Sequence, residues 1–127
     1  MENAADDGDG AMSGESSHSN AAPGTTEQRV KFAKGTTGAE ISGSLKSGAS
    51  ARYVLGAKNE QFLYVRVAPH HHTIEYQIFN PDGSTLLGMI SSDKEYKGQL
   101  WQNGDHVIEV INRSSHTVKY NVIFGIE

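Results

Sequence analysis

Residues 73–86 read Thr-Ile-Glu-Tyr-Gln-Ile-Phe-Asn-Pro-Asp-Gly-Ser-Thr-Leu, and this stretch decides the fold class. The large apolar side chains of Ile74, Tyr76 and Ile78 alternate with polar ones, which is the period-two pattern of a half-buried β-strand. The strand must end at residues 80–83, Asn-Pro-Asp-Gly, because proline lacks an amide donor and glycine accepts the positive φ of a turn. The sequence therefore predicts an antiparallel strand that runs into a structural corner.

The chain repeats this logic from Arg29 onward. Turn residues separate short segments rich in Val, Ile, Tyr and Phe, and no window of helical length carries a sustained apolar stripe. The pattern predicts an all-β fold, an antiparallel two-sheet β-sandwich of about 8–9 strands. The expected strands span residues 29–33, 39–46, 52–57, 62–68, 73–79, 85–90, 94–100, 106–112 and 117–126.

The composition changes near residue 28. Residues 1–28 are almost entirely small or polar, so this segment cannot bury enough apolar surface to offset the entropy of ordering it. We predict a disordered tail over residues 1–28 and one β-sandwich domain over residues 29–127. The tail is either a tether behind a removed signal sequence or lipid-attachment site, or a binding motif.

The overall composition limits the kinds of partner that the protein can bind. The chain has 11 basic and 15 acidic side chains, a net charge of -4 and no cysteine. This balance predicts no polybasic surface for nucleic acid, and the lack of cysteine excludes disulfides and cysteine-based zinc sites. No run of about 18 apolar residues is present to span a bilayer. We expect a periplasmic or secreted protein without its signal sequence, with a lipid anchor through the tail left open.

The motifs of common enzyme classes are absent from the sequence. There is no G-x-S-x-G elbow, no phosphate-binding G-x-x-x-x-G-K, no H-E-x-x-H and no complete calcium loop. Asp93, Glu95 and Glu109 could supply a carboxylate pair for glycoside chemistry, but a domain this small seldom forms the sugar-lined cleft which that chemistry needs. We therefore expect a protein that acts by binding, without a cofactor.

Three consecutive histidines, His70, His71 and His72, follow Pro69. Adjacent residues of an extended segment point to opposite faces, so all three could ligate one metal ion only through a tight turn. The nearest carboxylate further along the chain is that of Glu75. The pattern predicts a solvated loop between strands rather than a metal site, and it leaves metal binding open.

Taken in order, these elements resemble the bacterial pre-peptidase C-terminal type of β-sandwich over about residues 41–124. The resemblance rests on the strand around Tyr53, the apolar strand after Gln61, the corner at residues 80–83, residues 104–110 (Gly-Asp-His-Val-Ile-Glu-Val) and the closing strand at residues 120–122. This resemblance implies a fold, because such sandwiches carry many unrelated functions.

A narrower resemblance begins at residues 30–35, Val-Lys-Phe-Ala-Lys-Gly. Together with Ala39, Ser42-Gly43, Lys46, Tyr53 and Ala57-Lys58, this segment is similar to the opening of bacterial periplasmic inhibitors of goose-type lysozyme. Residues 109–110 and 119–122 fit the same family. The chain departs from the family pattern at residues 47–51, Ser-Gly-Ala-Ser-Ala, where those inhibitors carry aromatic side chains.

The second resemblance implies inhibition by obstruction, in which loops enter the lysozyme cleft, occupy its acidic groups and so protect bacterial peptidoglycan. A planar arginine on a rigid loop suits this role, because it can bind a carboxylate through two hydrogen bonds. The candidate partner-binding residues are Arg113 as the bidentate donor, Ser114 and Ser115 as neutral partners, His116 as a donor that gains charge below neutral pH, and Tyr53. The alternative is that Arg113 and His116 are solvated hairpin residues.

A competing interpretation is an accessory module that binds cell-wall polysaccharide or a partner protein. Exposed aromatic rings offer flat faces for sugars, and Trp101, beside Gln102, is the best candidate for such a ring. Tyr64 and Tyr76 fit the core by their alternation. The other reading of Trp101 is a partly buried residue at an edge of the sandwich.

Overall fold

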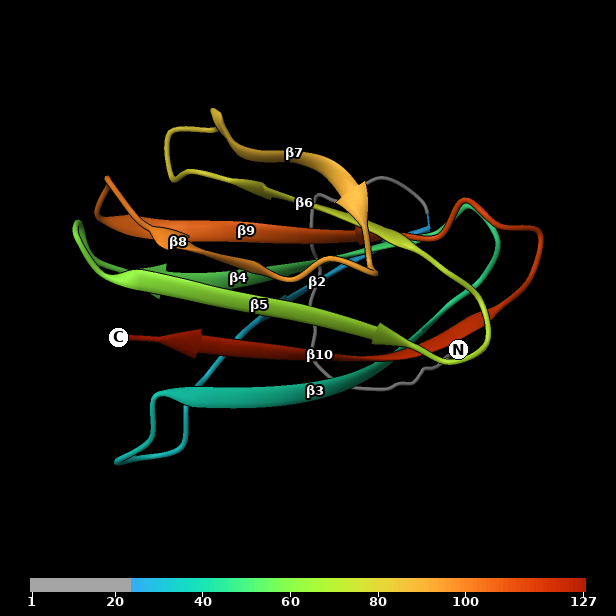
Figure 1. Ribbon diagram of the computed structural model, residues 1–127, viewed down its shortest axis with the longest axis horizontal. Helices are drawn as coiled ribbons and strands as arrows, with labels where there is room; N and C mark the ends of the chain where they lie inside the picture. The colour runs from blue at the N-terminus through green and yellow to red at the C-terminus, as the bar shows by residue number, and fades with distance from the viewer. Residues whose placement is uncertain (1–23) are drawn as a thin grey trace.

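The computed structural model describes residues 24–127, which form a sandwich of two β-sheets (Figure 1). The predicted all-β class is confirmed. The four-stranded sheet has the order β3 (Gly38–Leu45), β10 (Val118–Ile126), β5 (Phe62–Pro69) and β8 (Tyr96–Gln99). The five-stranded sheet has the order β2 (Thr25–Arg29), β4 (Ser50–Ala57), β9 (Gly104–Ile111), β6 (Glu75–Phe79) and β7 (Thr85–Ser91). Across these described residues, no helix is long and apolar enough to cross a membrane.

The first strand differs from the prediction. It spans Thr25–Arg29 instead of residues 29–33, and it pairs in parallel with β4, from Thr25 beside Ser50 to Arg29 beside Val54. Residues 25–28 were expected in the tail because they are polar and show no apolar alternation. They form a strand nevertheless, since β2 lies at the sheet edge and is held by main-chain pairing. The remaining residues expected in the tail, 1–23, lie outside the described residues.

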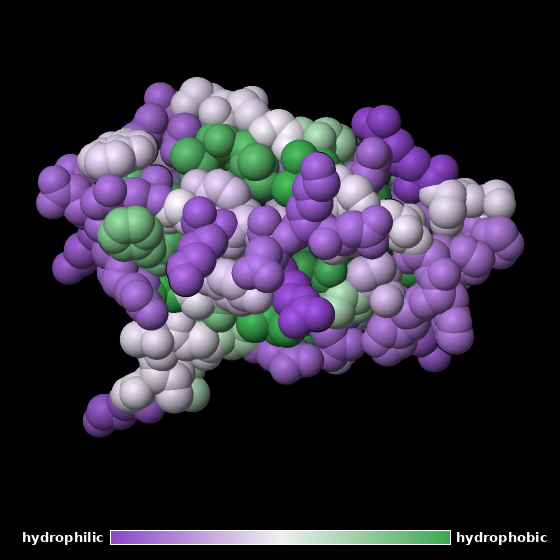
Figure 2. Space-filling model, viewed as in Figure 1, coloured by the Kyte–Doolittle hydropathy of each residue, from purple (hydrophilic) through white to green (hydrophobic). Residues whose placement is uncertain are grey.

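The core lies between the sheets and is built by strand alternation. In β10 every second side chain, from Val118 to Ile126, is buried, and the intervening ones are not. Tyr76 and Ile78 of β6 face the same interior, as the opening stretch of sequence predicts. A fully buried side chain of this size contributes about 1.5–3 kcal/mol relative to an exposed one. On the face shown in Figure 2, apolar side chains appear as small patches among polar ones.

A hydrogen bond between two tyrosines joins the sheets inside the core. The hydroxyl of Tyr53 on β4 lies 2.5 Å from that of Tyr120 on β10, and both side chains are buried. Burial raises the pKa of Tyr53 and that of Tyr120 above their ordinary value, so both phenols stay neutral. Tyr120 crosses Gly43 of β3, where a Cβ atom would lie only 2.4 Å from the Tyr120 hydroxyl oxygen. The arrangement therefore requires glycine at position 43.

The corner at residues 80–83 is a closed hydrogen-bonded turn. The amide of Gly83 donates to the carbonyl of Asn80 at 2.9 Å, and Gly83 has a φ of 89°, which suits glycine. One carboxylate oxygen of Asp82 accepts from the amide and the hydroxyl of Ser84. These hydrogen bonds lower the pKa of Asp82. The polar groups of this turn are thus used to hold the corner.

The connecting loops gather at two opposite ends of the sandwich (Figure 1). We call one the histidine end, which comprises the β3–β4 loop (residues 46–49), the β5–β6 loop (residues 70–74), the β7–β8 loop (residues 92–95) and the β9–β10 loop (residues 112–117). The other is the tryptophan end, formed by residues 58–61, 80–84 and 100–103. This division decides which candidate residues can act together.

We predict that Gly43→Ala destabilises the fold by about 1–3 kcal/mol, because the added methyl group overlaps the Tyr120 ring in a packed core. Gly38→Ala in the same strand is the matched control, since its new Cβ would lie 3.5 Å from the nearest atom, the carbonyl oxygen of Phe124. Urea unfolding of both variants measures the difference. Equal unfolding midpoints would contradict the proposed role of Gly43.

The buried side chain of His106 should make the free energy of unfolding depend on pH. Its side chain is fully buried, and burial lowers its pKa below the ordinary value of 6.5, because the imidazolium form loses its hydration. The unfolded chain therefore takes up a proton below about pH 6.5 that the folded core disfavours, so stability falls as the pH falls. We expect the urea midpoint to drop on acidification, and to drop less in His106→Leu than in the exposed control His71→Gln. Equal drops would exclude this role for His106.

Candidate functional site

The β9–β10 loop at the histidine end is held closed by one buried side chain, Asn112. The Asn112 amide nitrogen donates to the carbonyl oxygens of Leu45, at 2.9 Å, and His116, at 2.7 Å. Its amide oxygen accepts from the backbone amide of Ser114 at 2.9 Å and from the Ser114 hydroxyl at 2.7 Å. A single core residue therefore fixes both the start and the end of the loop.

The neighbouring β3–β4 loop braces the same segment. The amide of Gly48 donates to the carbonyl of Asn112 at 2.8 Å, and the amide of Asn112 donates to the carbonyl of Ala49 at 3.0 Å. The Ser47 hydroxyl donates to the carbonyl of Ser114 at 2.7 Å. A loop held in this way loses little conformational entropy when it binds a partner.

Arg113 extends from this loop into solvent, with 67% of its side chain exposed. Its Nε lies 3.3 Å from a carboxylate oxygen of Glu75 on β6. An exposed ion pair of this kind contributes little stability, so a stronger acceptor could replace it. Within residues 24–127 the two terminal nitrogens of Arg113 have no hydrogen-bond partner, and both can donate to an incoming carboxylate.

The two serines of the loop have different roles. The Ser114 hydroxyl donates to the amide oxygen of Asn112 and lies 3.1 Å from the carbonyl oxygen of His116, so it supports the loop conformation. Ser115 is exposed, and its hydroxyl lies 3.4 Å from the Nδ1 of His116. Of the two serines predicted as partner contacts, Ser115 is the one whose hydroxyl is more available.

The structure brings the histidine run beside this loop. The rings of His72 and His116 stack with centroids 4.2 Å apart and planes 7° from parallel. The sequence predicts a solvated loop for residues 70–72 but gives no sign that this loop meets the loop of Arg113. No local sequence pattern relates positions more than 40 residues apart. This contact follows only from the order of the strands in the sheets. No group of three or more His, Cys, Asp or Glu residues in the described part of the chain is placed to hold a metal ion.

Two predicted partner-binding residues lie away from Arg113. Tyr53 is only 3% exposed and bonds to Tyr120 in the core, so its side chain is not available at the surface. This corrects its assignment, because β4 turns Tyr53 inward. Trp101 is 64% exposed, which fits the expected exposed ring, but it lies at the tryptophan end. The six candidates therefore do not form one site, whereas residues 113–116 remain together.

The charge of the sandwich differs from the net charge of the whole chain. Residues 1–23 hold five acidic side chains and no lysine or arginine, whereas residues 24–127 hold 11 basic and 10 acidic ones. The sandwich itself is therefore nearly balanced. At the histidine end it carries Lys46, Lys94, Arg113 and Lys119 in addition to the histidines, and also Asp93 and Glu95 of the β7–β8 loop. The part of this end formed by the histidines and the β9–β10 loop offers positive charge and hydrogen-bond donors to a partner.

No protein-family model matches the chain, and no curated protein matches it. Solved structures do resemble it. PliG from Aeromonas hydrophila, a periplasmic lysozyme inhibitor of g-type lysozyme, superposes with a TM-score of 0.72 at 25% identity, over 81% of this chain and 97% of that chain. A mutant of the Escherichia coli PliG, also a periplasmic inhibitor of g-type lysozyme, gives 0.62 at 24% identity, over 82% and 99%.

A third similar structure is the pre-peptidase C-terminal domain of collagenase from Bacillus anthracis. Its TM-score is 0.56 at 10% identity, over 86% of this chain and 100% of that domain. The structural neighbours thus come from both groups that the sequence resembles, and the predicted resemblance is confirmed.

We predict that Asn112→Ala loosens the β9–β10 loop and lowers stability by about 1–3 kcal/mol, because it leaves buried carbonyl groups unpaired. The amides of Ser114 and His116 should then exchange with solvent faster, which hydrogen exchange followed by NMR measures. Asn103→Ala is the control, since Asn103 accepts one hydrogen bond, from the amide of Asn59, at the tryptophan end. Unchanged exchange at Ser114 would contradict the role given to Asn112.

Proposed function

We propose that this protein is a periplasmic or secreted inhibitor of lysozyme, with goose-type (g-type) lysozyme as the favoured target. The observation that carries the proposal is the likeness to the Aeromonas hydrophila inhibitor, which extends over 97% of that protein. The similar Aeromonas hydrophila protein is a periplasmic inhibitor, which supports a non-catalytic role and the same location for this chain.

The inhibitory surface in this proposal is the β9–β10 loop. It projects from the histidine end, and Asn112 and the β3–β4 loop fix its shape before any partner arrives. Blocking a cleft requires a protrusion that keeps its conformation, because each segment ordered on binding lowers the affinity. This loop meets that requirement with hydrogen bonds alone.

Arg113 supplies the chemistry of recognition. A lysozyme cleft carries carboxyl groups, and a guanidinium binds a carboxylate through two parallel N–H···O hydrogen bonds. Arg113 would exchange its contact with Glu75 for such a pair, in a cleft from which water is excluded and the interaction is stronger. Ser115 and His116 lie next to it and would donate to neighbouring oxygens.

The proposed inhibitory surface has no aromatic side chain to insert into the lysozyme cleft. The β3–β4 loop has no aromatic side chain, and the exposed ring of Trp101 is at the opposite end of the sandwich. The polar loop around Arg113 would therefore carry most of the binding free energy. Such dependence on one arginine makes the proposal easy to test.

We predict that the protein slows lysis of peptidoglycan by g-type lysozyme at equimolar concentration, and that Arg113→Ala weakens inhibition about 30-fold or more, as expected for an arginine hot spot. The decrease in turbidity of a peptidoglycan suspension measures this, with chicken-type and invertebrate-type lysozymes run in parallel to define the target.

Arg29→Ala is the matched control for this experiment. Arg29 is also exposed and ion-paired, with its Nη2 2.6 Å from an oxygen of Asp105, but it lies on β2 away from the histidine end. The Arg29→Ala variant should inhibit lysozyme as well as the parent protein does. If no lysozyme type is slowed, the proposed function is wrong; if Arg113→Ala inhibits as well as Arg29→Ala, the role of Arg113 is wrong.

A further inference from the structure

Four histidines and a lysine surround one open depression at the histidine end. The depression is lined by His70, His71, His72, His116, Thr117 and Lys119. None of these residues carries a carboxylate, although the chain as a whole is acidic. The ionisable groups that line this depression are therefore each either positive or able to become positive.

Main-chain hydrogen bonds hold the turn of residues 70–72 that carries these imidazoles. The amide of His70 donates to the carbonyl of Lys119 at 2.8 Å, and the amide of His72 donates to the carbonyl of His70 at 3.0 Å. His71 between them has a φ of 78°, a left-handed conformation that is uncommon for a residue other than glycine. The Nε2 of His70 lies 3.1 Å from the amide oxygen of Asn121. The tight turn thus presents three imidazoles from consecutive positions.

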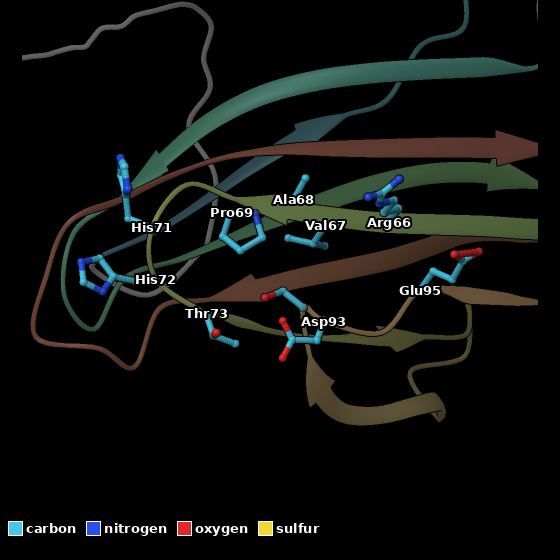
Figure 3. Close-up of a pocket in the computed structure, with 10 residues that line it drawn as sticks. Arg66, Val67, Ala68, Pro69, His71, His72, Thr73, Asp93 and Glu95 are labelled. Carbon is cyan, nitrogen blue, oxygen red and sulfur yellow. The ribbon is translucent and has the colours of Figure 1, made fainter.

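Acidic groups line a second hollow on the same turn. Figure 3 shows this hollow, which is lined by His71 and His72 together with the acidic residues Asp93 and Glu95. The histidine depression itself is lined by one permanently charged residue, Lys119 of β10. The carboxylate of Glu40 on β3 lies nearby, because the Asn121 side chain that contacts His70 also donates to a Glu40 oxygen at 2.9 Å. Glu40 and Glu75 each have a partner, Asn121 and Arg113 respectively, and neither of them lines the depression.

We propose that this depression is a binding site for carboxylate groups on a protein partner, and that its affinity is set by pH. The proposal rests on the function proposed above, with the same lysozyme as partner and the histidines as a second contact beside Arg113. Protonation of His72 and His116 would place two positive charges on rings 4.2 Å apart, which repel each other. A carboxylate between or beside them offsets that repulsion.

Binding and protonation are therefore linked, and each favours the other. Histidine is the side chain that normally gains its charge between about pH 8 and pH 5. Protonated histidines would add positive charge to the depression and hold carboxylates more tightly, whereas with neutral histidines only Lys119 and Arg113 attract them. The protein would inhibit most strongly in a mildly acidic medium.

The first test compares inhibition of g-type lysozyme at about pH 5.5 and about pH 7.5. The double variant His72→Gln/His116→Gln keeps polar side chains but cannot gain charge. Lys58→Gln, an exposed lysine at the tryptophan end, is the control for net charge. We expect acidification to improve inhibition by the parent protein and Lys58→Gln about fivefold more than inhibition by the double variant. The titration of the lysozyme itself is common to all three, so an equal pH effect would overturn the inference.

The second test needs no lysozyme. A short poly-L-glutamate peptide, with inorganic phosphate in a parallel arm, is titrated into the protein at about pH 5.5 and the imidazole C–H signals are followed by NMR. Shifts of the His70, His72 and His116 signals with poly-glutamate, lost above neutral pH and in the double variant, are expected. No shift, or tighter binding of phosphate than of poly-glutamate, would overturn the carboxylate site. Shifts without inhibition of any lysozyme would instead overturn the proposed function.

Discussion

The contact that organises this sandwich is the buried hydrogen bond between Tyr53 and Tyr120, one from each sheet. It exists because Gly43 leaves room for the Tyr120 ring to cross β3. The bond fixes β4 against β10, and therefore fixes the ends of the strands from which the loops of the histidine end depart. A bulkier residue at position 43 would move the ring, separate the two hydroxyls and leave both unpaired in the core, where an unpaired polar group is costly.

The buried side chain of Asn112 connects this rigid part of the core to the β9–β10 loop. That side chain is fully buried, yet its hydrogen bonds run to Leu45 on β3 and to His116 in the β9–β10 loop. The position of Arg113 is thus set by the core rather than by contacts at the surface. The same logic applies to the turn of residues 70–72, which is tied to β10 by main-chain bonding. Polar, exposed loops can be well defined when buried groups hold their ends.

Charge in this protein is separated along the chain. The acidic side chains that make the net charge negative are concentrated in residues 1–23, whereas the sandwich is nearly neutral and gathers Lys46, Arg113, Lys119 and four histidines at one end. A whole-chain charge therefore describes neither part. For binding, the local field at the contact surface matters, because exposed charges further apart than about 10 Å are screened by salt.

The sequence alone predicted the fold class, eight of the nine strands nearly in place and the corner at residues 80–83, because alternation and turn chemistry act between neighbours in the chain. It did not reveal β2, which is polar and held by main-chain bonds, or the inward position of Tyr53. It also placed Arg113 and Trp101 in one set of candidates. Only the tertiary structure separated these two residues and joined His72 to His116, since contacts between distant loops depend on the order of strands in the sheets, which no local pattern records.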